Sequence, residues 1–168
     1  MFAVSNPLSG EEFLGMVEFM PLVSIDFIIR NQQGEILLGK RNNAPAKNYW
    51  FVPGGRIWKN ECIQDAARRI ARKEIGFELS RPKLFGVFDH IYPDNFMEKP
   101  GINTHYVVIA LDSTLSSAAK IQPDEQHSDL RFWSIADLLS DPNVHPNTRR
   151  YFDGAPSIPL VKKSLEHS

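Results

Sequence analysis

A strand, a glycine turn and a helix follow one another directly in the middle of the sequence, and this unit constrains the fold most. The aromatic run at 49–52 is typical of a strand, and Pro53-Gly54-Gly55 stops it. Asn60 suits an N-cap and Gly76 suits the left-handed position after a helix, so we predict a helix over residues 61–75. The rest of the chain must pack around this strand–turn–helix unit.

The predicted helix is amphipathic. Apolar residues recur at three- and four-residue spacing and predict one buried stripe: Ile63, Ala66, Ala67 and Ile70. Cationic residues crowd the second half of the helix, where they also suit its negative dipole end, and we expect Arg68 and Arg72 to face solvent. We expect Cys62 to pack on this helix.

The remaining segments predict a hairpin over residues 21–41, with Asn31 to Gly34 at its turn. Further strands are predicted at 83–92, 105–112 and 129–133, and helical patterns at 135–139 and 147–152. The Pro/Gly/Asn-rich loop 93–103 is a candidate lid. We therefore expect one domain over residues 1–168, with an N-terminal arm (1–20) and a C-terminal tail (154–168).

Composition excludes several function classes. The 168 residues are 42% hydrophobic and carry a formal net charge of -1, so no general field favours nucleic acid or an anionic membrane. No apolar stretch approaches the roughly 20 residues of a spanning helix, and no secretory signal is evident. The single cysteine cannot form an intrachain disulfide. We expect a cytoplasmic protein that binds neither nucleic acid nor membrane.

The spacing Gly55-x5-Glu61-x7-Arg69-x4-Glu74-x-Gly76 resembles the Nudix box, the family pattern GX5EX7REUXEEXGU. The resemblance implies an α/β fold, an α/β/α sandwich with a mixed β-sheet. By the same resemblance, Glu61 and Arg69 are expected to form a structural ion pair between the loop and the helix.

The chain departs from this pattern on the helix. Three glutamates follow the pattern's arginine and share one helical face, where they can collect divalent cations. Ile70, Lys73 and Glu74 occupy these positions here, so one Mg²⁺ per subunit is expected instead of a cluster.

The GDP-mannose mannosyl hydrolases within the Nudix superfamily share this degenerate box. Other segments are also similar to that subfamily: PLVSIDFI (21–28), GEILLGKR (34–41), YWFVPGGR (49–56), NTHYVV (103–108) and PDEQH (123–127). The resemblance implies hydrolysis of GDP-mannose or GDP-glucose to GDP and free hexose, by water attack at the sugar C1 with inversion. It also implies a homodimer whose ligand is a small nucleotide sugar, a GDP-hexose.

The same resemblance assigns roles to individual residues. The Mg²⁺ ligands are the carbonyl of Gly54, the carboxylate of Glu74 and the amide oxygen of Gln126. His127 is the candidate general base, since a neutral imidazole can accept a proton from water. The remaining assignments are Arg41 and Arg56 to the diphosphate, Tyr106 to a phosphate or the sugar, Asp26 and His90 to substrate, and Leu8 and Phe13 to guanine.

Two alternatives remain open from the sequence. A Nudix pyrophosphohydrolase would attack phosphorus, although the loss of acidic residues at positions 70 and 73 argues against it. A noncatalytic module would bind a nucleotide sugar as a regulator, but pure binding does not require His127 beside Gln126.

Overall fold

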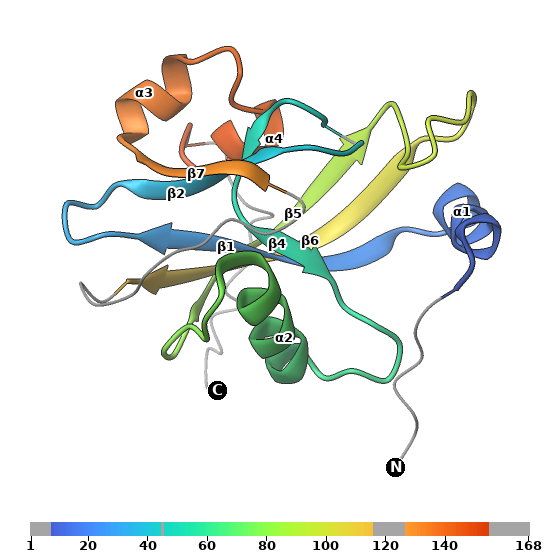
Figure 1. The fold of residues 1–168 in the computed structure, drawn as a ribbon, viewed down its shortest axis with the longest axis horizontal. Helices are drawn as coiled ribbons and strands as arrows, with labels where there is room; N and C mark the ends of the chain where they lie inside the picture. Colours follow the sequence, from blue (N-terminus) through green and yellow to red (C-terminus); the bar gives the residue numbers. More distant parts are fainter. Residues whose placement is uncertain (1–7, 45, 116–126, 155–168) are drawn as a thin grey trace, which may run out of the picture.

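The computed structural model describes residues 8–44, 46–115 and 127–154, which form one mixed β-sheet flanked by helices (Figure 1). The strands are β1 (Leu22–Arg30), β2 (Ile36–Arg41), β3 (Trp50–Phe51), β4 (Gly54–Arg56), β5 (Lys83–Tyr92), β6 (Thr104–Thr114) and β7 (His127–Trp133). The helices are α1 (Gly10–Phe19), α2 (Ile63–Ile75), α3 (Ile135–Ser140) and α4 (Pro146–Arg149). Among these described residues, no helix is long and apolar enough to span a membrane.

The sheet divides into two halves that share one point of contact. β1 runs parallel to β6 along its whole length, and β5 closes that edge antiparallel to β6. β2 pairs with β3 and β7, and it meets β1 only at the register pair Arg30↔Ile36. Beyond this pair the predicted hairpin splays, and β4 occupies the other edge of β1 through Asp26↔Gly54. A space therefore opens between the far ends of β1 and β2.

Helices cover both faces of the sheet, which confirms the predicted α/β/α architecture. In Figure 1, α2 lies on one side, and α3 and α4 lie on the other. Two buried apolar clusters match these layers: α2 packs over Phe27 and Leu37, while Leu138 and Tyr151 pack over Ile28 and Leu38. Alternate residues of β1 and β2 face opposite clusters, as the two-residue period of a strand requires.

Helix α2 differs from the prediction at its start. It begins at Ile63 with Cys62 at the N-cap position, because Asn60 adopts a positive φ of 67° and lies in the preceding turn. Ile63 is 49% exposed and not part of the buried stripe, and Cys62 is exposed, with its Sγ 3.0 Å from Asp65 Oδ2. The predicted end is confirmed, since Gly76 takes a left-handed φ of 84°.

Two elements lie outside the prediction from sequence. Pro53-Gly54-Gly55 does not end the strand region, because the chain continues into β4 along β1. Helix α1 was not predicted; Ser9 and Glu12 form a capping box at its start, and it buries only Leu14 and Val17. Because α1 lies beside β6 and the 93–103 loop, it forms a side wall next to the splayed strands (Figure 1).

Candidate functional site

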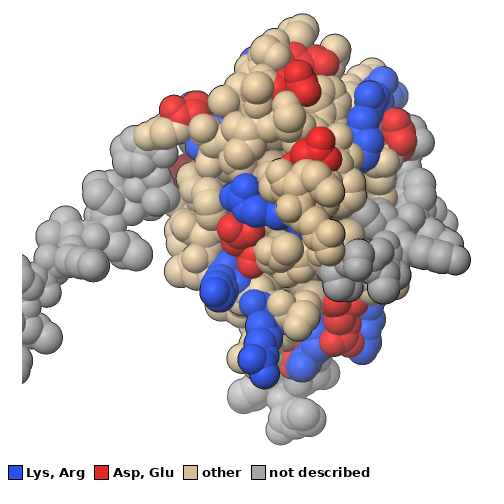
Figure 2. Space-filling model, turned by 90° about the vertical axis from the view of Figure 1, so that its left-hand side faces the viewer, with Lys and Arg blue, Asp and Glu red and all other residues tan. Residues whose placement is uncertain are grey.

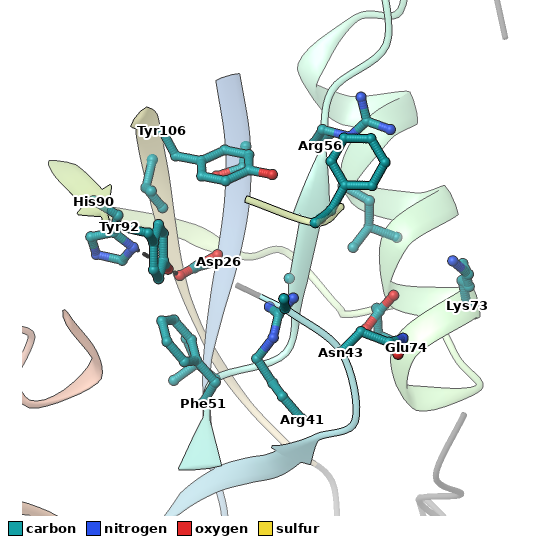
Figure 3. A pocket seen from close by; sticks show the side chains of 18 of the residues that line it. Asp26, Arg41, Asn43, Phe51, Arg56, Lys73, Glu74, His90, Tyr92 and Tyr106 are labelled. Atoms are coloured by element: carbon teal, nitrogen blue, oxygen red, sulfur yellow. Dashed lines mark ion pairs between the residues drawn. The ribbon is translucent and has the colours of Figure 1, made fainter. Parts of the chain in front are cut away.

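A cavity of about 700 Å³ opens where β1 and β2 splay apart. Its walls come from α1, β1, β2, the 42–48 loop, β4, α2, β5, β6 and the 93–103 loop. Of the predicted site residues, it brings together Phe13, Asp26, Arg41, Gly54, Arg56, Glu74, His90 and Tyr106 (Figure 3). Segments that are far apart in sequence therefore supply a single site.

The cavity has an excess of cationic side chains. Arg41, Lys47, Arg56 and Lys73 line it, and none forms an ion pair with any residue that the structure describes. The Arg56 guanidinium lies 3.7 Å from the centroid of the Phe13 ring, which fixes its direction through a cation–π contact. The surface seen in Figure 2 instead mixes acidic and basic side chains. The cavity thus differs from that face in offering positive charge that no described carboxylate pairs with, and such charge attracts an anion.

A further cation in the cavity wall, Arg69, serves the structure. Its Nε and Nη2 donate to the two carboxylate oxygens of Glu61 at 2.7 Å each, and Nη2 also donates to the Arg56 carbonyl at 2.8 Å. Hydrogen bonds from Arg69 lower the pKa of Glu61, so the carboxylate is charged at neutral pH. The expected ion pair between loop and helix is confirmed, and it holds β4 and Arg56 against α2.

Opposite α2 lies a buried polar cluster, which we call the polar wall: Asp26, His90 and Tyr151. The Tyr151 hydroxyl donates to Asp26 Oδ2 at 2.7 Å, and its oxygen lies 3.2 Å from His90 Nε2. Burial raises the pKa of Asp26 to about 6, although the Tyr151 hydrogen bond and Arg41 oppose this shift. Burial lowers the pKa of His90 to about 3, so its ring is neutral and can donate to Tyr151.

Sequence reasoning missed Tyr151, which does not line the cavity but contacts the lining residues Asp26 and His90. It follows α4 and is buried, and it joins the C-terminal part of the domain to β1 and β5. Position 151 falls within the predicted helical pattern 147–152, but no local spacing distinguishes this tyrosine from one that packs in a core. Only the contact across the sheet reveals its polar role.

Residues from α2 form the other side of the cavity, which we call the helix wall: Ile70, Lys73 and Glu74. Glu74 is 2% exposed and Ile70 is equally buried, whereas Lys73 is exposed to solvent. Ile70 also packs on β4, because a Cβ placed on Gly55 would lie 3.2 Å from its Cγ2. The wall therefore presents one buried carboxylate, one cation and one apolar side chain.

These residues fit a single Mg²⁺ better than a metal cluster. Within the described part of the chain, no group of three or more His, Cys, Asp or Glu residues could hold a metal ion. Glu74 is a buried oxygen donor at the cavity wall, and Mg²⁺ commonly takes one or two carboxylates, waters and substrate phosphates. Gly54 lies at the same wall and must remain a glycine, since its Cβ would meet Asp26 Oδ1 at 2.4 Å.

The remaining predicted residues lie at the edges of the site or outside the described chain. Leu8 is exposed before α1 and does not line the cavity, whereas Phe13 does. The backbone of His127 begins β7 and pairs with Arg41, which brings this position to the splayed end of β2. Gln126 lies outside the described residues.

Sequence reasoning also missed Phe96, the partner of Phe13. The two ring centroids lie 4.9 Å apart, and both rings line the cavity. Phe96 is carried by the 93–103 loop, whose backbone is braced by the buried side chain of Asn95 through bonds to Lys99 and Ile102. Two aromatic rings thus border the cavity where α1 meets this loop.

Comparison with known sequences identifies the family. A family profile described as "NUDIX domain" matches residues 20–154. This chain belongs to the Nudix family. The low-salt glycan biosynthesis protein Agl8 of Haloferax volcanii is 38% identical to it over 149 residues, which cover 87% of this chain and 89% of Agl8.

Solved Nudix structures share the fold of this Nudix domain. A MutT Nudix hydrolase from Burkholderia pseudomallei has a TM-score of 0.64 at 28% identity, and the match covers 79% of this chain and 95% of that one. The Nudix domain of Shewanella oneidensis NrtR, solved with ADP ribose, has a TM-score of 0.59 at 18% identity and covers 86% and 96%. The latter likeness supports the fold alone.

Proposed function

We propose that this Nudix domain is a Mg²⁺-dependent hydrolase that cleaves GDP-mannose or GDP-glucose at the sugar C1, with inversion, to GDP and free hexose. The observation that carries the proposal is one cavity lined by two arginines, neither of which forms an ion pair with a described residue, and by a single carboxylate from α2. Agl8, by its name, acts in glycan biosynthesis, a process that uses activated sugars. This agrees with a nucleotide-sugar substrate.

Cleavage at carbon depends on stabilising the departing GDP. Arg41 and Arg56 project from β2 and β4, on different sides of the cavity, so they can contact different oxygens of one diphosphate (Figure 3). Guanidinium groups form charge-assisted hydrogen bonds with phosphate, and these bonds strengthen as negative charge develops on the leaving oxygen. The two arginines therefore favour the transition state over the bound substrate.

Bound Mg²⁺ would neutralise further charge on the diphosphate as a Lewis acid. Glu74 is its proposed carboxylate ligand, with the Gly54 carbonyl and the Gln126 amide oxygen completing the protein donors. Ile70 and Lys73 replace the other two carboxylates of the family pattern. The resulting wall is poorly suited to assembling several cations around an attacking water at phosphorus.

His127 is the proposed base for the attacking water. It removes one proton as the water oxygen bonds to C1, while the C1–oxygen bond to the β-phosphate breaks and its electron pair leaves with GDP. The backbone of His127 pairs with that of Arg41, the proposed diphosphate contact, and this pairing supports the assignment. A base held near the leaving group fits a reaction centre at the first sugar carbon.

Two residues of the polar wall, Tyr106 and the aromatic rings complete the proposed substrate contacts. Asp26, His90 and Tyr106 line the cavity opposite the helix wall, where carboxylate, imidazole and phenol groups suit sugar hydroxyls (Figure 3). Phe13, with Leu8 near it in sequence, is the proposed guanine contact, because aromatic faces stack on nucleobases. In this arrangement the sugar and the guanine lie on opposite sides of Arg41 and Arg56.

Hydrolysis in ¹⁸O-labelled water tests the reaction directly. Mass spectrometry of products from GDP-mannose should find the label in the free sugar and none in GDP. Label in GDP or GMP would instead establish attack at phosphorus and reject the proposal. Binding of GDP-mannose without any release of GDP would support the regulatory alternative, provided that His127→Gln binds it equally well.

A further inference from the structure

Lys73 stands where the family pattern has a glutamate, and it lines the cavity beside Glu74. We infer that Lys73 binds the diphosphate of the nucleotide directly, as a built-in cation that allows binding of nucleoside diphosphate without metal. This inference rests on the proposed function for its ligand class. It adds a diphosphate contact on the helix wall.

Lys73 lies where it can reach a diphosphate in the cavity. It projects from α2 next to Glu74, on the side of the cavity away from His90 and Tyr92 (Figure 3). Arg41 lies between these two sides of the cavity. A diphosphate bound to Arg41 would therefore have α2 next to it. A lysine has four methylene groups and three donors, which let it follow a phosphate oxygen at this border.

The charges around Lys73 favour an anion. It forms no ion pair with a described residue, whereas its neighbour Arg72 pairs with Glu78 and does not line the cavity. Apart from Arg69, which pairs with Glu61, four cationic residues line the cavity, against the three carboxylates Asp26, Glu74 and Glu98. The cavity lining therefore has a net positive charge, which favours an anion.

The replacement of glutamate by lysine at position 73 changes what this position attracts. A glutamate at position 73 would attract a cation and repel phosphate unless metal lay between them. The lysine reverses that requirement, since an ammonium group attracts the phosphate without an intermediary. Metal and lysine then act in parallel on the diphosphate, one through Glu74 and one directly.

Isothermal titration calorimetry with GDP in EDTA and about 50 mM salt tests the inference. We expect wild-type protein to bind GDP, and Lys73→Gln to raise Kd about 10-fold, as for loss of a charge-assisted hydrogen bond. Lys73→Arg keeps the charge and should stay within about threefold of wild type. Higher salt should reduce the difference between wild type and Lys73→Gln, because exposed charges are screened.

Arg72→Gln is the matched control, since Arg72 is an exposed cation of the same helix turn that points outside the cavity. It should bind GDP as wild type does. Guanosine, which lacks phosphate, should not distinguish Lys73→Gln from wild type. Equal GDP affinity in wild type and Lys73→Gln, an equal loss in Arg72→Gln, or no wild-type binding of GDP in EDTA would each overturn the inference.

The result of the GDP-binding experiment does not depend on which bond the protein cleaves. Label from ¹⁸O-water in GDP would reject hydrolysis at C1 while leaving the lysine contact intact. Conversely, label in the sugar with no effect of Lys73→Gln on GDP binding would retain the proposed reaction and reject the contact.

Discussion

The helix wall and the polar wall face each other across one cavity, yet they are built in opposite ways. Residues of the helix wall lie within two turns of α2, and Lys73 reaches solvent. The polar wall joins Asp26 and Tyr151 across 125 positions of sequence, and both are buried. The charge at exposed Lys73 can therefore be changed with little effect on folding, whereas the charge of buried Asp26 is tied to folding.

The largest effect is expected at His127, the proposed base, which belongs to neither wall. His127→Gln should lower kcat by roughly 10² to 10⁴, the range for loss of a general base. Steady-state release of GDP from GDP-mannose measures it. His105→Gln is the control, because His105 pairs with Asp89 on β5 and does not line the cavity. Wild-type kcat in His127→Gln would remove this residue from catalysis.

The next effect concerns the cost of charge on the polar wall. Burial raises the pKa of Asp26 from 3.8 to about 6, so its ionisation opposes folding above that pH. A shift of about two units corresponds to about 3 kcal/mol. Asp26→Asn should therefore raise the free energy of unfolding at pH 8 by up to about 3 kcal/mol, although it weakens substrate turnover.

The pH dependence of this stability gain tests whether the ionisation of Asp26 causes it. At pH 4 Asp26 is protonated in the folded chain and about half ionised in the unfolded chain, so most of the gain from Asp26→Asn should disappear there. Urea unfolding at pH 4 and pH 8 measures the difference. Glu11→Gln, an exposed change in the first turn of α1, should stay within about 0.5 kcal/mol at both. A loss of stability at pH 8 would contradict the buried charge as the cause.

The helix wall is tested by separating metal from lysine. Glu74→Gln should raise the Mg²⁺ concentration for half-maximal activity about 10- to 100-fold, because a neutral amide is a weaker ligand than a carboxylate. Glu78→Gln is the control, because Glu78 follows α2, pairs with Arg72 and does not line the cavity. A Mg²⁺ titration that is unchanged in Glu74→Gln would exclude Glu74 as a ligand.

The smallest effect is expected at Tyr151, which we propose positions Asp26. Tyr151→Phe removes the donor that lowers the pKa of Asp26, so that pKa should rise further. We expect the acid limb of the kcat/KM profile to move up by about one pH unit and stability to fall by about 1 kcal/mol. A ¹³C NMR titration of the Asp26 carboxyl group reads the pKa directly.

Tyr49→Phe is the control for Tyr151→Phe, because Tyr49 is half-exposed and does not line the cavity. It should leave both the pH profile and the Asp26 titration unchanged. An unshifted titration in Tyr151→Phe would limit this tyrosine to packing.

The contrast between the walls also explains what the sequence could predict. Helix α2 and strand β5 follow from periodicity and capping, which act between neighbours in sequence, and β5 was predicted at its observed bounds. The start of α2 was misplaced because Asn60 serves a turn, and α1 was missed because its apolar side is largely exposed. The roles of Tyr151 and Phe96 depend on contacts across the fold, which no local pattern contains.

Gly54 has a consequence for redesigning the cavity. A methyl group there would meet Asp26 Oδ1 at 2.4 Å and the Ile25 carbonyl at 2.6 Å, so every other residue would push β4 away from β1. A library that seeks another substrate preference should keep this glycine and vary the exposed cavity positions Asn43, Lys47 and Glu98. Directed evolution of this site then begins at its mouth and leaves its floor unchanged.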